Sequence, residues 1–113
     1  MLKPFWKKAM NEISVEELKK KIDNKEDVFI LDVRQPDEHR FCHISDNLIP
    51  LNELPKRAGE LDPKRETVVY CHSGSRSARA VQYLTQLGFQ NVRNLRGGIN
   101  EWAEKIDPTM PKY

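Results

Sequence analysis

The pattern of apolar and polar positions divides the chain into short strands and helices. The run DVFILDV at 27–33 is almost entirely apolar and rich in β-branched residues, which is typical of a strand covered on both faces. Shorter apolar runs predict further strands at 67–70 (TVVY) and 91–95 (NVRNL), and a very short apolar piece lies in 48–55 (LIPLNELP). Pro36 ends the strand pattern after the first of these runs, at 27–33.

Three other segments repeat their apolar residues with the period of an α-helix. The first covers residues 13–22, where Ser14 followed by Glu17 forms a capping box at the helix start. The second covers 75–87 and is ended by Gly88, and the third covers 99–106. The first two helices are predicted to bury one face each, at Val15, Leu18 and Ile22 and at Ala80, Val81, Leu84 and Leu87.

Strands that alternate with helices at this spacing predict an α/β fold, with a central, mostly parallel sheet flanked by helices on both faces. A length of 113 residues suits a single domain over 1–113, with 1–11 as an N-terminal extension and 107–113 as an irregular tail. Apolar residues make up 38% of the chain, and no apolar run has the length that a membrane span needs. We therefore expect no membrane partner.

The charge pattern changes this picture little. The net charge of +2 arises from interspersed residues of both signs, which is too mild to indicate a nucleic-acid partner. The first ten residues, MLKPFWKKAM, lack the apolar core of a signal peptide, so we expect a cytoplasmic protein. Phe5 and Trp6 within them are either an exposed contact for a partner or a cap on the core, and the sequence leaves both open.

The strongest chemical signal is YCHSGSRSARA at 70–80. It places Cys71, one of only two cysteines, where a predicted strand ends and a helix begins. Ligands of parallel α/β sheets bind at this edge. A thiol reacts as the thiolate, which a helix N-terminus or a neighbouring cation stabilises.

The loop after Cys71 has the composition of an anion-binding nest. Successive backbone N–H groups can point inward in such a loop, and Gly74 supplies the positive φ or close approach that it requires. Arg76 adds a fixed charge that either bridges an anionic substrate or holds the loop. We call residues 71–77 the cradle loop; its predicted members are the nucleophile Cys71 and the binding residues His72, Ser73, Gly74, Ser75, Arg76 and Ser77.

The cradle loop and three further motifs resemble the rhodanese family of sulfurtransferases. The loop has the family form C-x-x-G-x-R-S. ILDVRQPDEHRFCHI at 30–44 resembles the family's LDVR-x-P-x-E stretch followed by GHI, LIPLNEL at 48–54 resembles its IPL segment, and NLRGGINEW at 94–102 resembles its closing L-x-GG-x-x-W. The resemblance implies a rhodanese fold without a cofactor, in which Cys71 accepts a sulfane sulfur as a persulfide and delivers it to a second nucleophile.

The length of the cradle loop separates this interpretation from its nearest rival. Four residues lie between Cys71 and Arg76, whereas related phosphatases and arsenate reductases have five and a wider cradle for a tetrahedral oxyanion. A shorter ring suits one outer sulfur atom, so phosphatase or arsenate reductase activity is disfavoured. A sulfur-relay or binding module with a protein partner and little small-molecule turnover stays open as the alternative.

Cys42 stands where the family usually has glycine before His-Ile. This cysteine and the ending EWAEKIDPTMPKY are similar to the C-terminal rhodanese domains of the ubiquitin-activating-like sulfurylases of the molybdopterin and thiamine pathways. Those enzymes also carry an adenylating domain, which this sequence lacks. The resemblance implies thiosulfate or a protein persulfide as donor, with a cysteine desulfurase and a ubiquitin-like sulfur carrier as candidate partners.

Several other residues have two interpretations. Cys42 is either a resolving thiol for Cys71, which requires Cα atoms within about 7 Å, or a small packed residue, and we favour packing. The resemblance gives Asp32 and Arg34 a supporting role as a charge pair at the active-site edge; the alternative is a solvated Arg34. His72 either tunes donor choice or is passive. The cysteine and histidine spacings do not match a zinc site, so we expect no metal.

Overall fold

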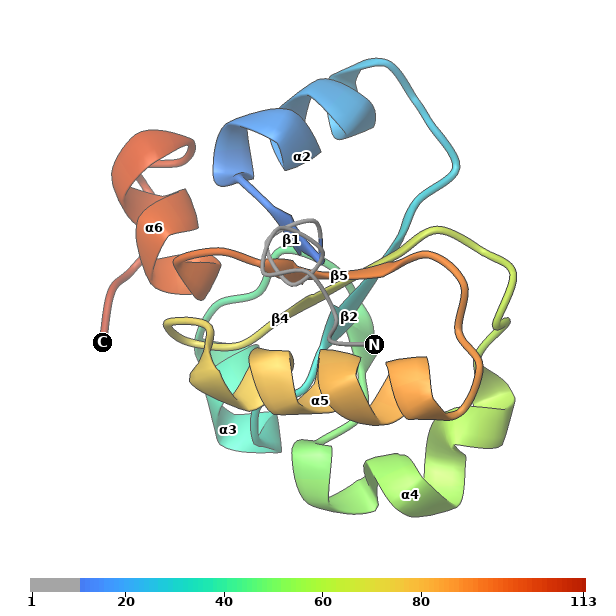
Figure 1. The fold of residues 1–113 in the computed structure, drawn as a ribbon. Helices are drawn as coiled ribbons and strands as arrows, with labels where there is room; N and C mark the ends of the chain where they lie inside the picture. Colours follow the sequence, from blue (N-terminus) through green and yellow to red (C-terminus); the bar gives the residue numbers. More distant parts are fainter. Residues whose placement is uncertain (1–10) are drawn as a thin grey trace.

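The computed structural model describes residues 11–113, and the predictions for Phe5 and Trp6 lie outside them. Its strands form one five-stranded sheet in the order β1-β5-β4-β2-β3 (Figure 1). The strands are β1 (Glu12–Ile13), β2 (Phe29–Asp32), β3 (Asn47–Leu48), β4 (Thr67–Tyr70) and β5 (Val92–Leu95). All the pairings are parallel, so every carboxyl end lies at the same edge of the sheet.

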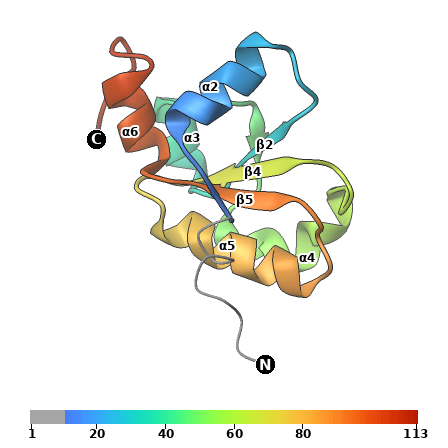
Figure 2. The same ribbon diagram turned by 45° about the horizontal axis from the view of Figure 1, so that its top comes forward.

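Helices cover both faces of this sheet (Figures 1 and 2). They are α2 (Val15–Asp23), α3 (Pro36–Phe41), α4 (Leu54–Arg57), α5 (Ser75–Gln86) and α6 (Gly98–Lys105), with 3₁₀ turns at Leu51–Glu53 and Ala58–Glu60. The predicted α/β class with flanking helices is confirmed. No helix among residues 11–113 is both long and apolar enough to cross a membrane.

The central strand β4 divides the core into two clusters. Val69 and Cys71 point to the side of α5, where they pack with residues such as Leu84. Val68 and Tyr70 point to the opposite side and pack with residues of α2 and α6. Because side chains alternate along a strand, burial of all four positions of β4 requires apolar layers on both faces. The cradle loop thus leaves a strand that is fixed from both sides.

The strand β1 and the helices α3 and α4 were not predicted. The strand β1 has only two residues, which is too short to show a period, and it forms by pairing with β5. The helix α3 begins at Pro36, where the sequence pattern predicts only the end of a strand. Proline fits the first turn of a helix because its missing N–H would have no partner there, and Gln35 and Glu38 complete a capping box.

The predicted buried faces of two helices are wrong at their last positions. Ile22 is 37% exposed and Leu87 is 50% exposed. A strand of four residues spans about 13 Å, while the 12 residues of α5 span about 18 Å. The final turn of the helix therefore extends past the sheet that buries its earlier residues.

Candidate active site

The cradle loop leaves the carboxyl end of β4 and leads directly into α5. Gly74 is the residue before the helix and has φ of +114°, the left-handed conformation that its sequence position predicted. Cys71 is only 1% exposed. The loop therefore holds the thiol at the edge of the sheet where ligands of parallel α/β proteins bind.

The sulfur of Cys71 faces hydrogen-bond donors from its own loop. The backbone N–H groups of Gly74 and Ser77 lie 3.2 and 3.4 Å from Sγ, and both point toward it. The Ser77 hydroxyl lies 3.3 Å from Sγ. Together with the N-terminus of α5, these donors favour negative charge on the sulfur. Ser73 and Ser75 are exposed, and neither side chain bonds to Sγ.

Asn94 on β5 completes this arrangement and was not predicted. Its Oδ1 lies 2.6 Å from the Ser77 hydroxyl, and its Nδ2 donates to the Gly74 carbonyl at 3.1 Å. The single proton of Ser77 is donated either to Asn94 or to Cys71 at a given moment. Asn94 is buried. An asparagine two residues after Val92, and so on the same buried face of the strand, was the sequence signal that could have revealed it.

The first turn of α6 holds the start of the cradle loop. The N–H of Ile99 donates to the Cys71 carbonyl at 2.9 Å, and that of Asn100 donates to the His72 carbonyl at 3.0 Å. A Cβ atom at Gly98 would lie 2.4 Å from the His72 carbonyl oxygen, and φ there is +60°. Glycine at this position permits the close backbone approach that lets α6 hold Cys71 in place.

Arg76 is held by α3. Its Nη1 and Nη2 donate to the two carboxylate oxygens of Glu38 at 2.7 and 2.9 Å. This bidentate pair raises the pKa of Arg76 and, through the hydrogen bonds from Arg76, lowers the pKa of Glu38 to about 2. Of the two roles that the sequence left open for Arg76, these contacts favour holding the loop.

This pair predicts a pH-dependent stability. The Glu38 carboxyl has an ordinary pKa of 4.5 and a folded pKa of about 2, so its stabilising effect is complete above pH 4.5 and is lost as the pH falls through 2. Urea unfolding should therefore give wild type a constant advantage over Glu38→Gln above pH 4.5, and the advantage should shrink below it. Glu104→Gln is the control, because that exposed carboxylate lies 4.0 Å from Lys112 Nζ. An advantage that does not change between pH 2 and 6 would contradict the assignment.

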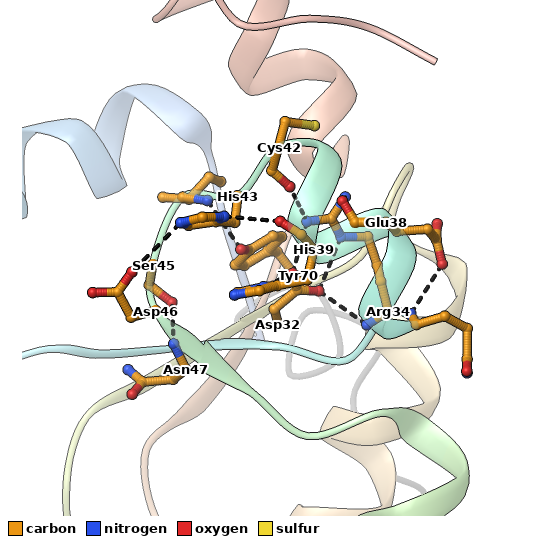
Figure 3. Close-up of polar contacts among 12 residues, drawn as sticks. Asp32, Arg34, Glu38, His39, Cys42, His43, Ser45, Asp46, Asn47 and Tyr70 are labelled. Carbon is orange, nitrogen blue, oxygen red and sulfur yellow. Dashed lines mark hydrogen bonds and ion pairs between the residues drawn. The ribbon is translucent and has the colours of Figure 1, made fainter.

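Asp32 and Arg34 form a fully buried ion pair beside α3 (Figure 3). Arg34 Nη2 and Nε donate to the two oxygens of Asp32 at 2.7 and 2.9 Å, and Nη2 also donates to the Cys42 carbonyl at 2.6 Å. Burial opposes the charge of Arg34, but its hydrogen bonds to Asp32 and Tyr113 outweigh that effect and raise its pKa. The alternative of a solvated Arg34 is wrong.

The second cysteine packs away from the first. Cys42 is 7% exposed and belongs to the cluster under α2 and α6, whereas Cys71 belongs to the cluster under α5. Both thiols are free. Their placement in different clusters supports the packing interpretation of Cys42. Among residues 11–113, no three His, Cys, Asp or Glu side chains are grouped as a metal site.

Fold and loop together define a small α/β domain with a cysteine in an amide-lined cradle, and the comparisons name its family. The chain belongs to the rhodanese-like family, since the model of the rhodanese-like domain matches residues 14–105. A protein of Allochromatium vinosum named sulfurtransferase is 43% identical over 95 residues, which are 83% of this chain and 89% of the relative.

Two further relatives extend the comparison. The adenylyltransferase and sulfurtransferase uba4 of Ogataea parapolymorpha is 35% identical over 75% of this chain, but the match spans only 22% of that protein. The crystal structure of a rhodanese-related protein from Thermoplasma volcanium superposes with a TM-score of 0.77 at 35% identity, covering 85% of this chain and 93% of that one. Family and fold together support a sulfurtransferase.

Proposed function

We propose that this protein transfers a sulfane sulfur, from thiosulfate or a protein persulfide, to a nucleophilic acceptor through a persulfide on Cys71. The observation that carries the proposal is the sulfur of Cys71 lying 3.2 and 3.4 Å from two backbone N–H groups at the start of α5. These donors stabilise a thiolate before the reaction and a persulfide anion after it.

The reaction balances without an external oxidant or reductant. The Cys71 thiolate attacks the outer sulfur of thiosulfate, a new S–S bond forms, and the old S–S bond breaks. Sulfite leaves with the electron pair of the broken bond. An acceptor nucleophile then attacks the outer sulfur of the Cys71 persulfide, and the thiolate leaves and is regenerated.

The remaining predicted site residues act as supports in this proposal. Gly74 and Ser77 supply the donors to the sulfur, and Arg76 fixes the far end of the loop through Glu38. Asp32 and Arg34 order α3. Arg34 donates to the carbonyl of Glu38 within this helix and to the carbonyl of Cys42 just after it. None of these roles requires a cofactor.

Intact-protein mass spectrometry after incubation with thiosulfate tests the proposal. We expect the wild-type protein to gain the mass of one sulfur atom and to lose it again on treatment with cyanide. Steady-state rates should give parallel lines in double-reciprocal plots, as a double displacement requires. If thiosulfate adds no sulfur, a cysteine desulfurase with cysteine provides a protein persulfide as donor. Absence of the mass gain with both donors would refute the persulfide.

A protein acceptor is the second candidate. Similarity to an adenylyltransferase and sulfurtransferase favours it, and we propose a ubiquitin-like sulfur carrier as the acceptor in that case. The two candidates differ in their acceptor kinetics. A relay module would form the Cys71 persulfide but transfer it to cyanide slowly, whereas an enzyme of small-molecule metabolism would turn over thiosulfate and cyanide continuously.

A further inference from the structure

The segment 107–113 follows α6, and we call it the strap. It begins with the N–H of Asp107 donating to the Trp102 carbonyl at 3.0 Å, and Met110 packs against the core under α2 and α6. In both views the strap runs beside α6 at the end of the sheet that carries the loop between β4 and α5 (Figures 1 and 2). The strap therefore lies next to the cradle loop, although it follows the four motifs that carry the family resemblance.

The hydroxyl of Tyr113 joins the two ion pairs of the site. It accepts a hydrogen bond from Arg34 Nη1 at 2.9 Å and donates one to Glu38 Oε2 at 2.8 Å. Partial burial raises the pKa of Tyr113 to about 12, so the phenol keeps the proton that it donates at neutral pH. Glu38 in turn holds Arg76, so the strap is connected to the far end of the cradle loop.

The ring of Tyr113 contacts the near end of the same loop. It stacks on His72, the residue after Cys71, with centroids 4.2 Å apart and planes inclined by 27°. The Tyr113 ring also packs edge to face with the ring of Phe41, with centroids 5.8 Å apart. The ring is thus fixed by contacts on several sides, against the residue that follows Cys71 in the cradle loop.

We propose that Tyr113 determines which acceptors reach the sulfur, by forming a wall at the mouth of the cradle loop that limits acceptor size. The inference rests on the proposed function, because the acceptors in question are the nucleophiles that take the sulfur from the Cys71 persulfide. Cys71 is only 1% exposed, and the ring cannot turn away without losing its bonds to Arg34 and Glu38 and its stacking on His72. Diatomic cyanide passes this wall more easily than a tripeptide thiol such as glutathione.

A comparison of a large and a small acceptor tests whether Tyr113 limits acceptor size. The ratio of kcat/KM for glutathione to kcat/KM for cyanide, with thiosulfate as donor, should rise about tenfold in Tyr113→Ala. It should rise less in Tyr113→Phe, which keeps the ring and its stacking on His72 but loses both hydroxyl bonds. Leu87→Ala is the matched control, because Leu87 is similarly exposed, at 50% against 46% for Tyr113, but lies past the other end of α5. An unchanged ratio in Tyr113→Ala would overturn the inference, as would equal losses with both acceptors.

A second measurement needs no sulfur chemistry. Alkylation of Cys71 by iodoacetamide and by the larger N-ethylmaleimide is followed by peptide mass spectrometry, which separates it from reaction at Cys42. Tyr113→Ala should accelerate the maleimide reaction about tenfold and the iodoacetamide reaction less. If the maleimide reaction is faster in Tyr113→Ala but neither donor adds sulfur to Cys71, the proposed function is refuted and the size limit stands. Equal rates in wild type and Tyr113→Ala would refute the size limit even where sulfur transfer is active.

Discussion

Cys71→Ser should abolish sulfur transfer, with a loss in kcat/KM of at least about a thousandfold. A serine hydroxyl is neither ionised near neutral pH nor able to hold a sulfane sulfur, so the first displacement has no nucleophile. The change removes little volume, and the cradle donors of Gly74 and Ser77 remain in place. Thiosulfate:cyanide activity and the mass gain on thiosulfate treatment measure the loss together.

Cys42→Ser is the matched control for this loss. Cys42 is also buried, but it packs in the cluster on the other face of the sheet. We expect this variant to gain one sulfur atom from thiosulfate and to retain most of the turnover. Activity that falls equally in both variants would make Cys42 a resolving thiol and would overturn its assignment as a packing residue.

Arg34→Met should destabilise the protein by about 3–5 kcal/mol. Arg34 and Asp32 are both fully buried, so removal of the guanidinium leaves the carboxylate of Asp32 without its counter-charge. Methionine is shorter than arginine and cannot donate to the carbonyls of Glu38 and Cys42, which adds to the cost. The free energy of unfolding from urea titration at neutral pH is the measurement.

Two further variants show whether the cost arises from burial of the charge. Arg57→Met also breaks two ion pairs, with Glu53 and Glu60, but these lie at the surface, so the loss of stability should be far smaller. The double variant Asp32→Asn/Arg34→Met removes both buried charges and should recover part of the stability. Equal losses in Arg34→Met and Arg57→Met would show that the buried charge is not the cause.

The sequence predicted the fold well where burial is two-sided. The apolar runs of β2, β4 and β5 and the capping box of α2 lie where the pattern placed them. The strand β1 escaped detection because pairing with β5, and not its own two residues, makes it a strand. Short elements of this kind are determined by tertiary contacts, which local periodicity does not contain.

The candidate site likewise contains contacts that a local motif predicts and contacts that depend on tertiary structure. Cys71, Gly74 and Ser77 lie within one loop, so their proximity follows from a local motif. Tyr113 bonds to Arg34 across 79 positions of the sequence, and no spacing rule connects them. Glu38 stood inside a motif that the sequence revealed, but its bond to Arg76 spans 38 positions and depends on how α3 sits beside α5.

The clamp that α6 places on the Cys71 and His72 carbonyls has a consequence for biosynthesis. Glu38 precedes the cradle in the chain, but Asn94, Ile99 and Asn100, which secure its start and its glycine, all follow it. A ribosome releases the chain from its N-terminus, and domains fold once their last elements have emerged. The Cys71 thiol therefore emerges before its burial is complete, and during that interval it is more open to oxidants and electrophiles than in the folded cradle, where it is 1% exposed.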